Sequence, residues 1–61
     1  MSEIIYVVYV KDLRTGVERH LDVCDDINEA ADYVDALNYE YAQSGLPCNA
    51  FYVVHIYDDE D

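Results

Sequence analysis

The chain has 61 residues, of which 14 are Asp or Glu and three are Lys or Arg, so its formal net charge is -11. An acidic surface of this kind is repelled by free nucleic acid and by anionic lipid, and the longest apolar run is too short to cross a bilayer, so we expect neither nucleic acid nor membrane as a direct partner. A hydrophobic fraction of 52% argues against disorder, and no secretory signal pattern is present, which predicts a cytoplasmic protein.

Two apolar runs in the N-terminal third predict a β-hairpin. Ile4 to Val10 is rich in β-branched and aromatic residues and is apolar on both alternating sides, as is typical of a central strand. A turn follows at 11–16, where Gly16 can adopt positive φ. Val17 to Val23 then alternates between apolar and polar side chains, with Arg19 interrupting the apolar side, so we expect a strand with one face in water. Its apolar side is predicted to carry Val17, Leu21 and Val23.

An amphipathic helix is predicted after the hairpin. Asp26 and Glu29 have the spacing of a capping box, in which the first accepts from backbone N–H groups and the second reaches back. Gly45 is a natural left-handed terminator and Pro47 prevents continuation, so the helix should run from about Ile27 to Ser44. Apolar residues recur along it at i, i+3 and i+4, which predicts a buried stripe. That stripe contains Ile27, Ala30, Ala31, Val34, Leu37 and Tyr41.

A last strand over Ala50–Tyr57 completes a β-β-α-β order, and we expect an α+β fold with one compact domain over 1–61 that ends in an acidic tail at 58–61. The simplest sheet is three-stranded and antiparallel, in the order 2-1-3, with the helix packed on one face. Because the first and third strands are apolar on both sides, the uncovered face is predicted to mediate a homodimer or to bind a partner. This face should contain some of Tyr6, Tyr9, Phe51, Val53 and Tyr57.

Residues that could carry chemistry are few and predicted to lie apart. Cys24 and Cys48 should fall at opposite ends of the sheet, too distant for a disulfide, so we expect two free thiols. His20 and His55 project from the two outer strands, some 10 Å apart at the usual strand spacing, and we expect no metal site. Without a cleft for paired carboxylates or a phosphate-binding loop, the sequence predicts a protein that is not an enzyme and has no cofactor.

The exposed face of the predicted helix is the main functional signal. Six acids from Asp25 to Glu40 span roughly 22 Å, about one per 4 Å, close to the phosphate spacing of about 3.4 Å along a DNA strand. An ordinary solvated face would intersperse lysines among them. We therefore expect this face to bind a basic nucleic-acid-binding protein, with carboxylates in place of phosphates and tyrosine rings against cations. The predicted contact residues are Glu29, Asp32, Tyr33, Asp35, Tyr39 and Glu40.

The hairpin at Ile4–Val23, the capped helix at Asp26–Gly45, the last strand at Ala50–Tyr57 and the charge together resemble the uracil-DNA glycosylase inhibitors of Bacillus phages. The chain is similar, more loosely, to small anti-CRISPR and antirestriction proteins. This resemblance covers the whole chain through topology and composition, and it implies an inhibitor encoded by a mobile element.

Two functions from different classes remain open on the sequence. The leading hypothesis is a DNA or RNA mimic that blocks the nucleic-acid groove of a host defence or repair enzyme, such as a CRISPR nuclease or a uracil-DNA glycosylase. The alternative is a small dimeric structural or regulatory module without mimicry, in which the helix acids form only a solvated surface.

Overall fold

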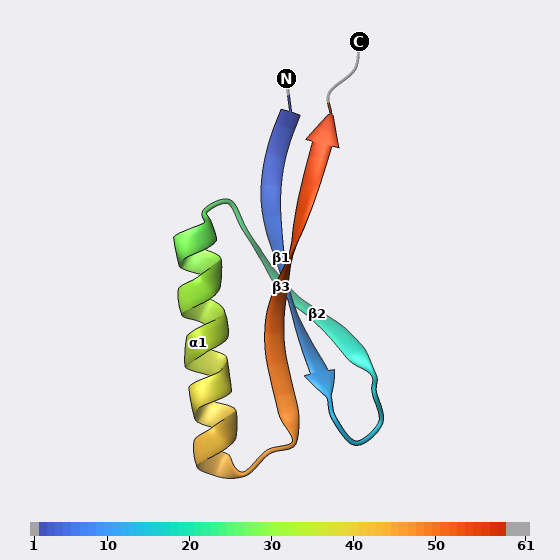
Figure 1. Ribbon diagram of the computed structural model, residues 1–61, viewed down its shortest axis with the longest axis vertical. Helices are drawn as coiled ribbons and strands as arrows, with labels where there is room; N and C mark the ends of the chain where they lie inside the picture. The colour runs from blue at the N-terminus through green and yellow to red at the C-terminus, as the bar shows by residue number, and fades with distance from the viewer. Residues whose placement is uncertain (1, 59–61) are drawn as a thin grey trace.

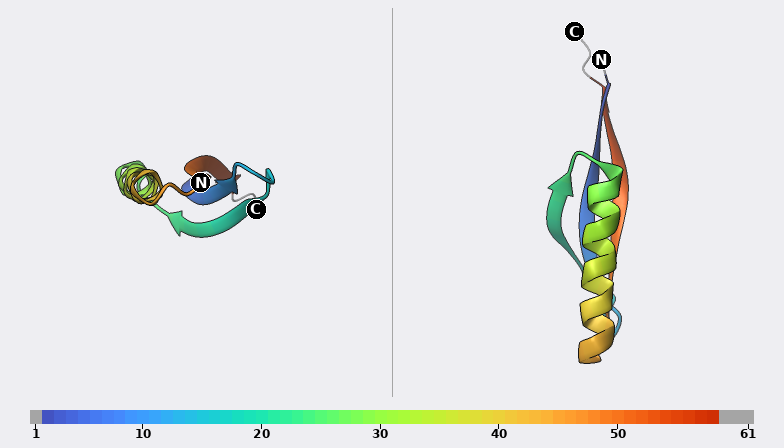
Figure 2. Two further views of the ribbon diagram at one scale, coloured as in Figure 1. Left: turned by 90° about the horizontal axis from the view of Figure 1, so that it is seen from below. Right: turned by 90° about the vertical axis from the view of Figure 1, so that its left-hand side faces the viewer.

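The computed structural model describes residues 2–58, which form three strands and one helix in the order β-β-α-β (Figure 1). The strands make one antiparallel sheet in the order β2-β1-β3, so the predicted α+β fold and strand order are confirmed. The helix forms a second layer against the sheet (Figure 2). The elements are β1 (Ser2–Asp12), β2 (Glu18–Cys24), α1 (Ile27–Ser44) and β3 (Cys48–Asp58).

The two long strands extend well beyond the rest of the fold. β1 and β3 pair over their full lengths, from Ser2 opposite Asp58 to Asp12 opposite Cys48, and each is longer than the sequence predicted. β2 pairs with β1 only from Tyr6 onwards, so the ends of β1 and β3 nearest the termini project as a two-stranded ribbon (Figure 1). We call residues 2–5 with 55–58 the terminal ribbon. Apart from the backbone of Asp58, the acidic tail predicted at 58–61 lies outside the described residues.

The terminal ribbon makes the molecule elongated. Its principal extents are 48 × 24 × 11 Å and its radius of gyration is 13.5 Å. A compact domain of this length has a radius of gyration of about 10.5 Å. The extra length increases surface without adding volume for a core, so this fold leaves much of its apolar content in contact with water.

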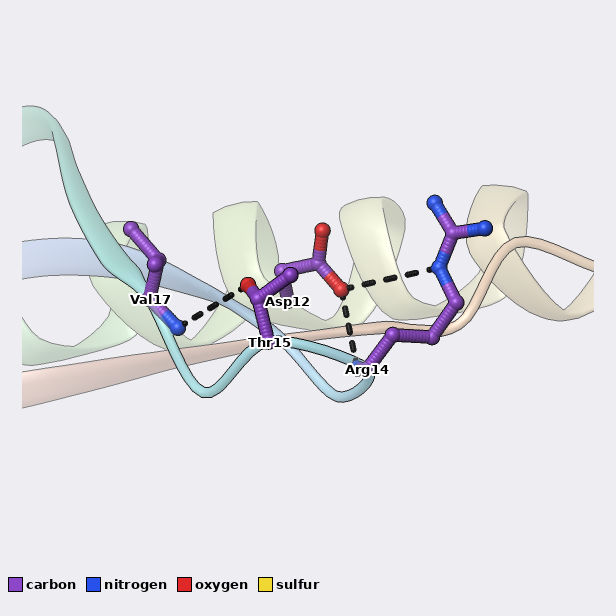
Figure 3. Close-up of polar contacts among 4 residues, drawn as sticks. All are labelled: Asp12, Arg14, Thr15 and Val17. Atoms are coloured by element: carbon purple, nitrogen blue, oxygen red, sulfur yellow. Dashed lines mark hydrogen bonds and ion pairs between the residues drawn. The ribbon is translucent and has the colours of Figure 1, made fainter.

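A tight turn joins β1 to β2 at the end opposite the terminal ribbon (Figure 1), and Figure 3 shows its polar contacts. The Asp12 carboxylate accepts a hydrogen bond of 2.9 Å from the backbone N–H of Arg14, and the Thr15 hydroxyl accepts one of 3.2 Å from that of Val17. Gly16 adopts φ of 78°, as the sequence predicted, and its N–H donates to the carbonyl of Asp12. Two side chains of the turn, those of Asp12 and Thr15, therefore accept hydrogen bonds from backbone N–H groups of the turn itself.

A register shift in β2 overturns the predicted alternation of that strand. Val8 faces Asp22 but the next residue, Tyr9, faces His20, so Leu21 is an extra residue in the ladder. Such a bulge reverses the alternation on either side of itself. As a result Arg19 lies opposite Val10 on the face that carries Val8. The predicted apolar side of Val17, Leu21 and Val23 does not exist as one surface, and all three side chains are exposed, by 53%, 39% and 44%.

The ends of α1 lie where the sequence placed them. Asp26 is the N-cap and accepts a hydrogen bond of 2.8 Å from the backbone N–H of Asn28. At the C-terminus Gly45 is left-handed, with φ of 68°, and the N–H of Leu46 donates to the carbonyl of Tyr41, which is the Schellman arrangement. The return half of the capping box is missing, because within residues 2–58 Glu29 makes no hydrogen bond back to Asp26.

The core is small and lies between α1 and one face of the sheet. Val8 and Ala30 are fully buried, and Cys24 is nearly so. Tyr6 and Tyr52 close this cluster in an edge-to-face contact, with ring centroids 5.9 Å apart. Partly buried side chains complete the layer, among them Val34 and Leu37 from α1.

Two predicted positions are corrected by this packing. Ile27 was expected in the buried stripe, but it is 46% exposed and takes no part in the core cluster, whose first helical member is Ala30. Tyr6 was a candidate for the uncovered face, but it packs against the core on the helix side. The uncovered face instead carries residues of the opposite alternation, and there Tyr9 stacks on Phe51 with centroids 5.6 Å apart.

Candidate functional site

All six predicted contact residues lie on the exposed face of α1. Ala30, Val34 and Leu37 direct the opposite side of the helix into the core, and this fixes which side faces outward. Among the large hydrophobic side chains of the described residues Tyr39 is the most exposed, at 67%, and Tyr33 is at the margin of the face, at 36%. The structure therefore brings together, on one helix face, Glu29, Asp32, Tyr33, Asp35, Tyr39 and Glu40.

Helical geometry sets how these side chains are spread. At about 100° per residue, Asp32 and Tyr39 share the middle of the exposed face, about two turns apart. Glu29 and Glu40 align along one flank, and Asp35 lies on the other. The carboxylates thus fan across roughly 140° of the helix circumference instead of forming one line. A partner that engaged all of them would have to wrap around the helix, as a groove does.

The acids of α1 have no basic neighbours on their own helix. α1 contains four acids and no Lys, Arg or His, and all three basic residues of the chain belong to the β1–β2 hairpin. One of these, Arg14, makes the one ion pair found within residues 2–58, at 3.9 Å from the Asp12 carboxylate. The negative field of α1 is therefore uncompensated, and it extends into solvent.

A side-chain clamp holds α1 to the sheet. The Asn38 amide group donates a hydrogen bond of 3.0 Å to the carbonyl of Ala50 and accepts one of 2.7 Å from its N–H. Ala50 lies on β3, and this pair of bonds imitates the bonding of a neighbouring strand. Together with the contact of Ala30 with Val8, it fixes the rotation of the helix and hence the direction of its acidic face.

The thiols and imidazoles do not form a site. Cys24 lies opposite Tyr6 and Cys48 opposite Asp12, six residues apart along β1, or about 20 Å, and both thiols are free as predicted. Desolvation raises the pKa of Cys24, and the carboxylates of Glu29, Asp22 and Asp25 raise it further, which makes this thiol a poor nucleophile. Among residues 2–58 no group of three or more His, Cys, Asp or Glu side chains could hold a metal.

The structure also contains a recess that the sequence did not predict. It lies between the β1–β2 turn and the C-terminal half of α1, with a volume of about 390 Å³. Arg19 enters its lining because the bulge in β2 turns this residue to the helix side, where Tyr41 and Cys48 also line it. The one sequence signal for this recess was Arg19, a charged residue at an apolar position of the alternating pattern predicted for the strand. The recess opens to solvent at the opposite end of the molecule from the terminal ribbon.

Comparison with family models, with curated proteins and with solved structures finds no match to this chain. Within residues 2–58 no helix has the length and hydrophobicity needed to cross a membrane.

Proposed function

We propose that this protein is a non-enzymatic inhibitor that occupies the nucleic-acid groove of a basic protein, with the acidic face of α1 in place of the phosphate backbone. The class of target is a host defence or repair enzyme that binds DNA or RNA. The acidic face is defined by Glu29, Asp32, Asp35 and Glu40, with Tyr33 and Tyr39 among them.

One observation carries this proposal: a rigidly held helix presents uncompensated carboxylates around exposed tyrosines. Repulsion among these carboxylates opposes folding, and no hydrogen bond or ion pair within residues 2–58 uses them. A surface that lowers stability and has no internal role is best explained by an external cation-rich partner. Electrostatic attraction over this face would accelerate the encounter, while a ring such as Tyr39 would contact an Arg or Lys side chain directly.

The experiment compares immobilised protein with a charge variant in capture of proteins from bacterial lysate. The test variant is Asp32→Lys with Glu40→Lys. Its matched control is Glu3→Lys with Glu18→Lys, which changes the net charge equally at exposed strand positions. A protein that binds the wild type and the control, but not the test variant, is a candidate target.

Competition then decides the mechanism. The captured protein is incubated with duplex DNA, single-stranded DNA and RNA of equal length, and release of the inhibitor is followed. Mimicry requires that one of these nucleic acids binds the target and displaces the inhibitor from a single site. If the target binds the inhibitor and a nucleic acid simultaneously and independently, mimicry is refuted. If the test variant and the control variant lose the target equally, the interaction reflects only the overall charge of the protein.

A second candidate function is supported by the uncovered face of the sheet. Val23, Val7 and Val53 form a cross-strand row there, and the outer two are 44% and 39% exposed. A dimeric interaction module would cover this row. If the protein dimerises through this row, Val23→Lys abolishes self-association while leaving α1 unchanged, and sedimentation equilibrium measures the result.

A further inference from the structure

The outer edge of β3 is open over only part of its length. β3 is an edge strand, so the N–H and C=O groups of alternate residues point away from β1. Ala50 is one of these residues, because its outward groups bond to Asn38. The same alternation directs the backbone of Val54 and Ile56 outward. Within residues 2–58 no hydrogen bond from outside the sheet reaches either of them.

The open part of the edge coincides with exposed apolar side chains. Val53, Val54, Ile56 and Tyr57 are 39%, 50%, 66% and 54% exposed, and they flank His55 symmetrically. Ile56 and Tyr57 belong to the terminal ribbon, which projects beyond α1 (Figure 1), and Val53 and Val54 directly precede it on β3. A two-stranded ribbon in water is marginal, and an exposed apolar strand edge is a template for another strand.

The charge distribution of β3 indicates which kind of strand could pair with its open edge. From Cys48 to Tyr57, β3 has no Asp, Glu, Lys or Arg. Two molecules of charge -11 repel one another over most of their surfaces, whereas along this segment they can approach without bringing carboxylates together. A basic partner would be drawn to α1 instead. The segment therefore suits a second copy of the same chain.

Symmetry and side-chain pairing select a register. We propose that two copies pair antiparallel through β3, with the two-fold axis at His55, to form a continuous six-stranded sheet. Val54 of each copy then lies opposite Ile56 of the other, and these outward-facing residues exchange two hydrogen bonds in each pair. On the other sheet face Val53 lies opposite Tyr57, so all four exposed side chains gain a favourable cross-strand neighbour. If the axis is shifted to Val54 or to Ile56, neither the Val54–Ile56 pair nor the Val53–Tyr57 pair forms.

Asn38 sets the limit of this pairing. In the proposed register Tyr52 lies opposite Asp58 of the second copy, and the next outward position, Ala50, is already occupied by the Asn38 amide. The clamp thus protects the edge at Ala50, beside α1, and leaves the edge from Val54 into the terminal ribbon available. The pairing does not involve the exposed face of α1, so it stands independently of the proposed function.

Crosslinking tests the register directly. In a Cys24→Ser, Cys48→Ser background, His55→Cys should form an intermolecular disulfide under mild oxidation with diamide, because residues on the axis form a non-hydrogen-bonded pair with Cα atoms about 4.5 Å apart. Val53→Cys in the same background is the control, since its symmetry mate lies about 13 Å away in this register. Equal crosslinking of the two variants, or none with His55→Cys, overturns the proposal.

Sedimentation equilibrium at high salt tests the interface without a crosslink. The wild type should be dimeric, and Ile56→Lys should be monomeric although it lowers the net repulsion between copies. Val54→Lys with Ile56→Glu should restore the dimer, because the register places each Lys opposite a Glu. Val23→Lys, on the uncovered face, should remain dimeric. A monomeric wild type, or a dimer lost in Val23→Lys and kept in Ile56→Lys, contradicts edge pairing. Circular dichroism confirms that each variant is folded.

Discussion

The side chain of Asn38 bonds to both backbone groups of Ala50, at 3.0 Å to the carbonyl and 2.7 Å from the N–H. One residue of a helix thereby occupies a position on the sheet edge that another strand would take. This relationship joins the two layers of a protein whose hydrophobic core is small, and it separates the protected part of β3 from the open part.

Removing the hydrogen bonds between Asn38 and Ala50 should lower the stability of the protein. Asn38→Ala leaves both groups of a buried residue without their partner, and we expect a loss of about 1–3 kcal/mol in the free energy of unfolding. Each kcal/mol corresponds to roughly 4–8 °C in Tm for a domain of this size. Gln43→Ala, at an exposed position of α1, is the matched control and should change Tm little. Equal stability of the two variants would show that the clamp contributes nothing.

The acids of the exposed face should be dispensable for folding. Asp32 stands three residues from both Glu29 and Asp35, so Asp32→Ala removes two repulsive pairs and should leave stability equal or a few tenths of a kcal/mol higher. Asp26→Ala changes the charge by the same amount but removes the N-cap, at a cost of about 0.5–2 kcal/mol. Urea denaturation of both variants measures the difference. A marked loss in Asp32→Ala would mean that this carboxylate has a structural role, which weakens the case for mimicry.

Stability should decline in alkali because of a buried thiol. Burial, and then the carboxylate of Glu29, hold the pKa of folded Cys24 above its ordinary value of 9.0. The folded state therefore binds this proton more tightly than the unfolded state, so the stabilisation is complete below pH 9.0 and is lost as pH rises through the folded pKa. Burial raises the pKa of Tyr41 above 10.0 in the same direction, which extends the decline.

Urea midpoints at intervals from pH 7 to pH 10.5 measure that decline. Cys24→Ala should flatten the curve just above pH 9 while lowering stability at every pH through lost packing. Glu29→Gln removes one source of the shift and should make the decline shallower. Identical pH profiles for Cys24→Ala and the wild type would assign the alkaline loss to other groups.

Binding kinetics should separate the charges of α1 from its rings. Once a target is captured, Asp32→Lys with Glu40→Lys should slow association, and the effect should shrink near 1 M salt, where the Debye length is about 3 Å. Tyr39→Ala should instead speed dissociation, with little dependence on salt, since it removes a direct contact. Surface plasmon resonance across a salt series tests both. An association rate that is insensitive to salt in the wild type argues against a phosphate-like role for the acids.

Local signals in the sequence were sufficient for the elements and their order. Asp26 and Gly45 placed the ends of α1 because capping depends on a few adjacent residues. The strands were found from apolar runs, and the order β2-β1-β3 followed from short connections and chain handedness. The outward position of the six predicted contact residues also came from the sequence, because helical period alone divides a helix into two faces.

Tertiary structure decided what no local pattern contains. The bulge at Leu21 depends on how β2 pairs with β1, and it moved Arg19 to the helix side to line the recess. The exposure of Ile27 and the burial of Tyr6 depend on where α1 crosses the sheet. The clamp between Asn38 and Ala50 joins residues twelve positions apart through hydrogen bonds to the edge of β3. That edge is open because β3 has a neighbouring strand, β1, on one side only. The sequence determines which side chains are apolar, and its periodicity predicts the face of each element on which they lie. Strand register and the packing of the layers determine which of these side chains remain exposed.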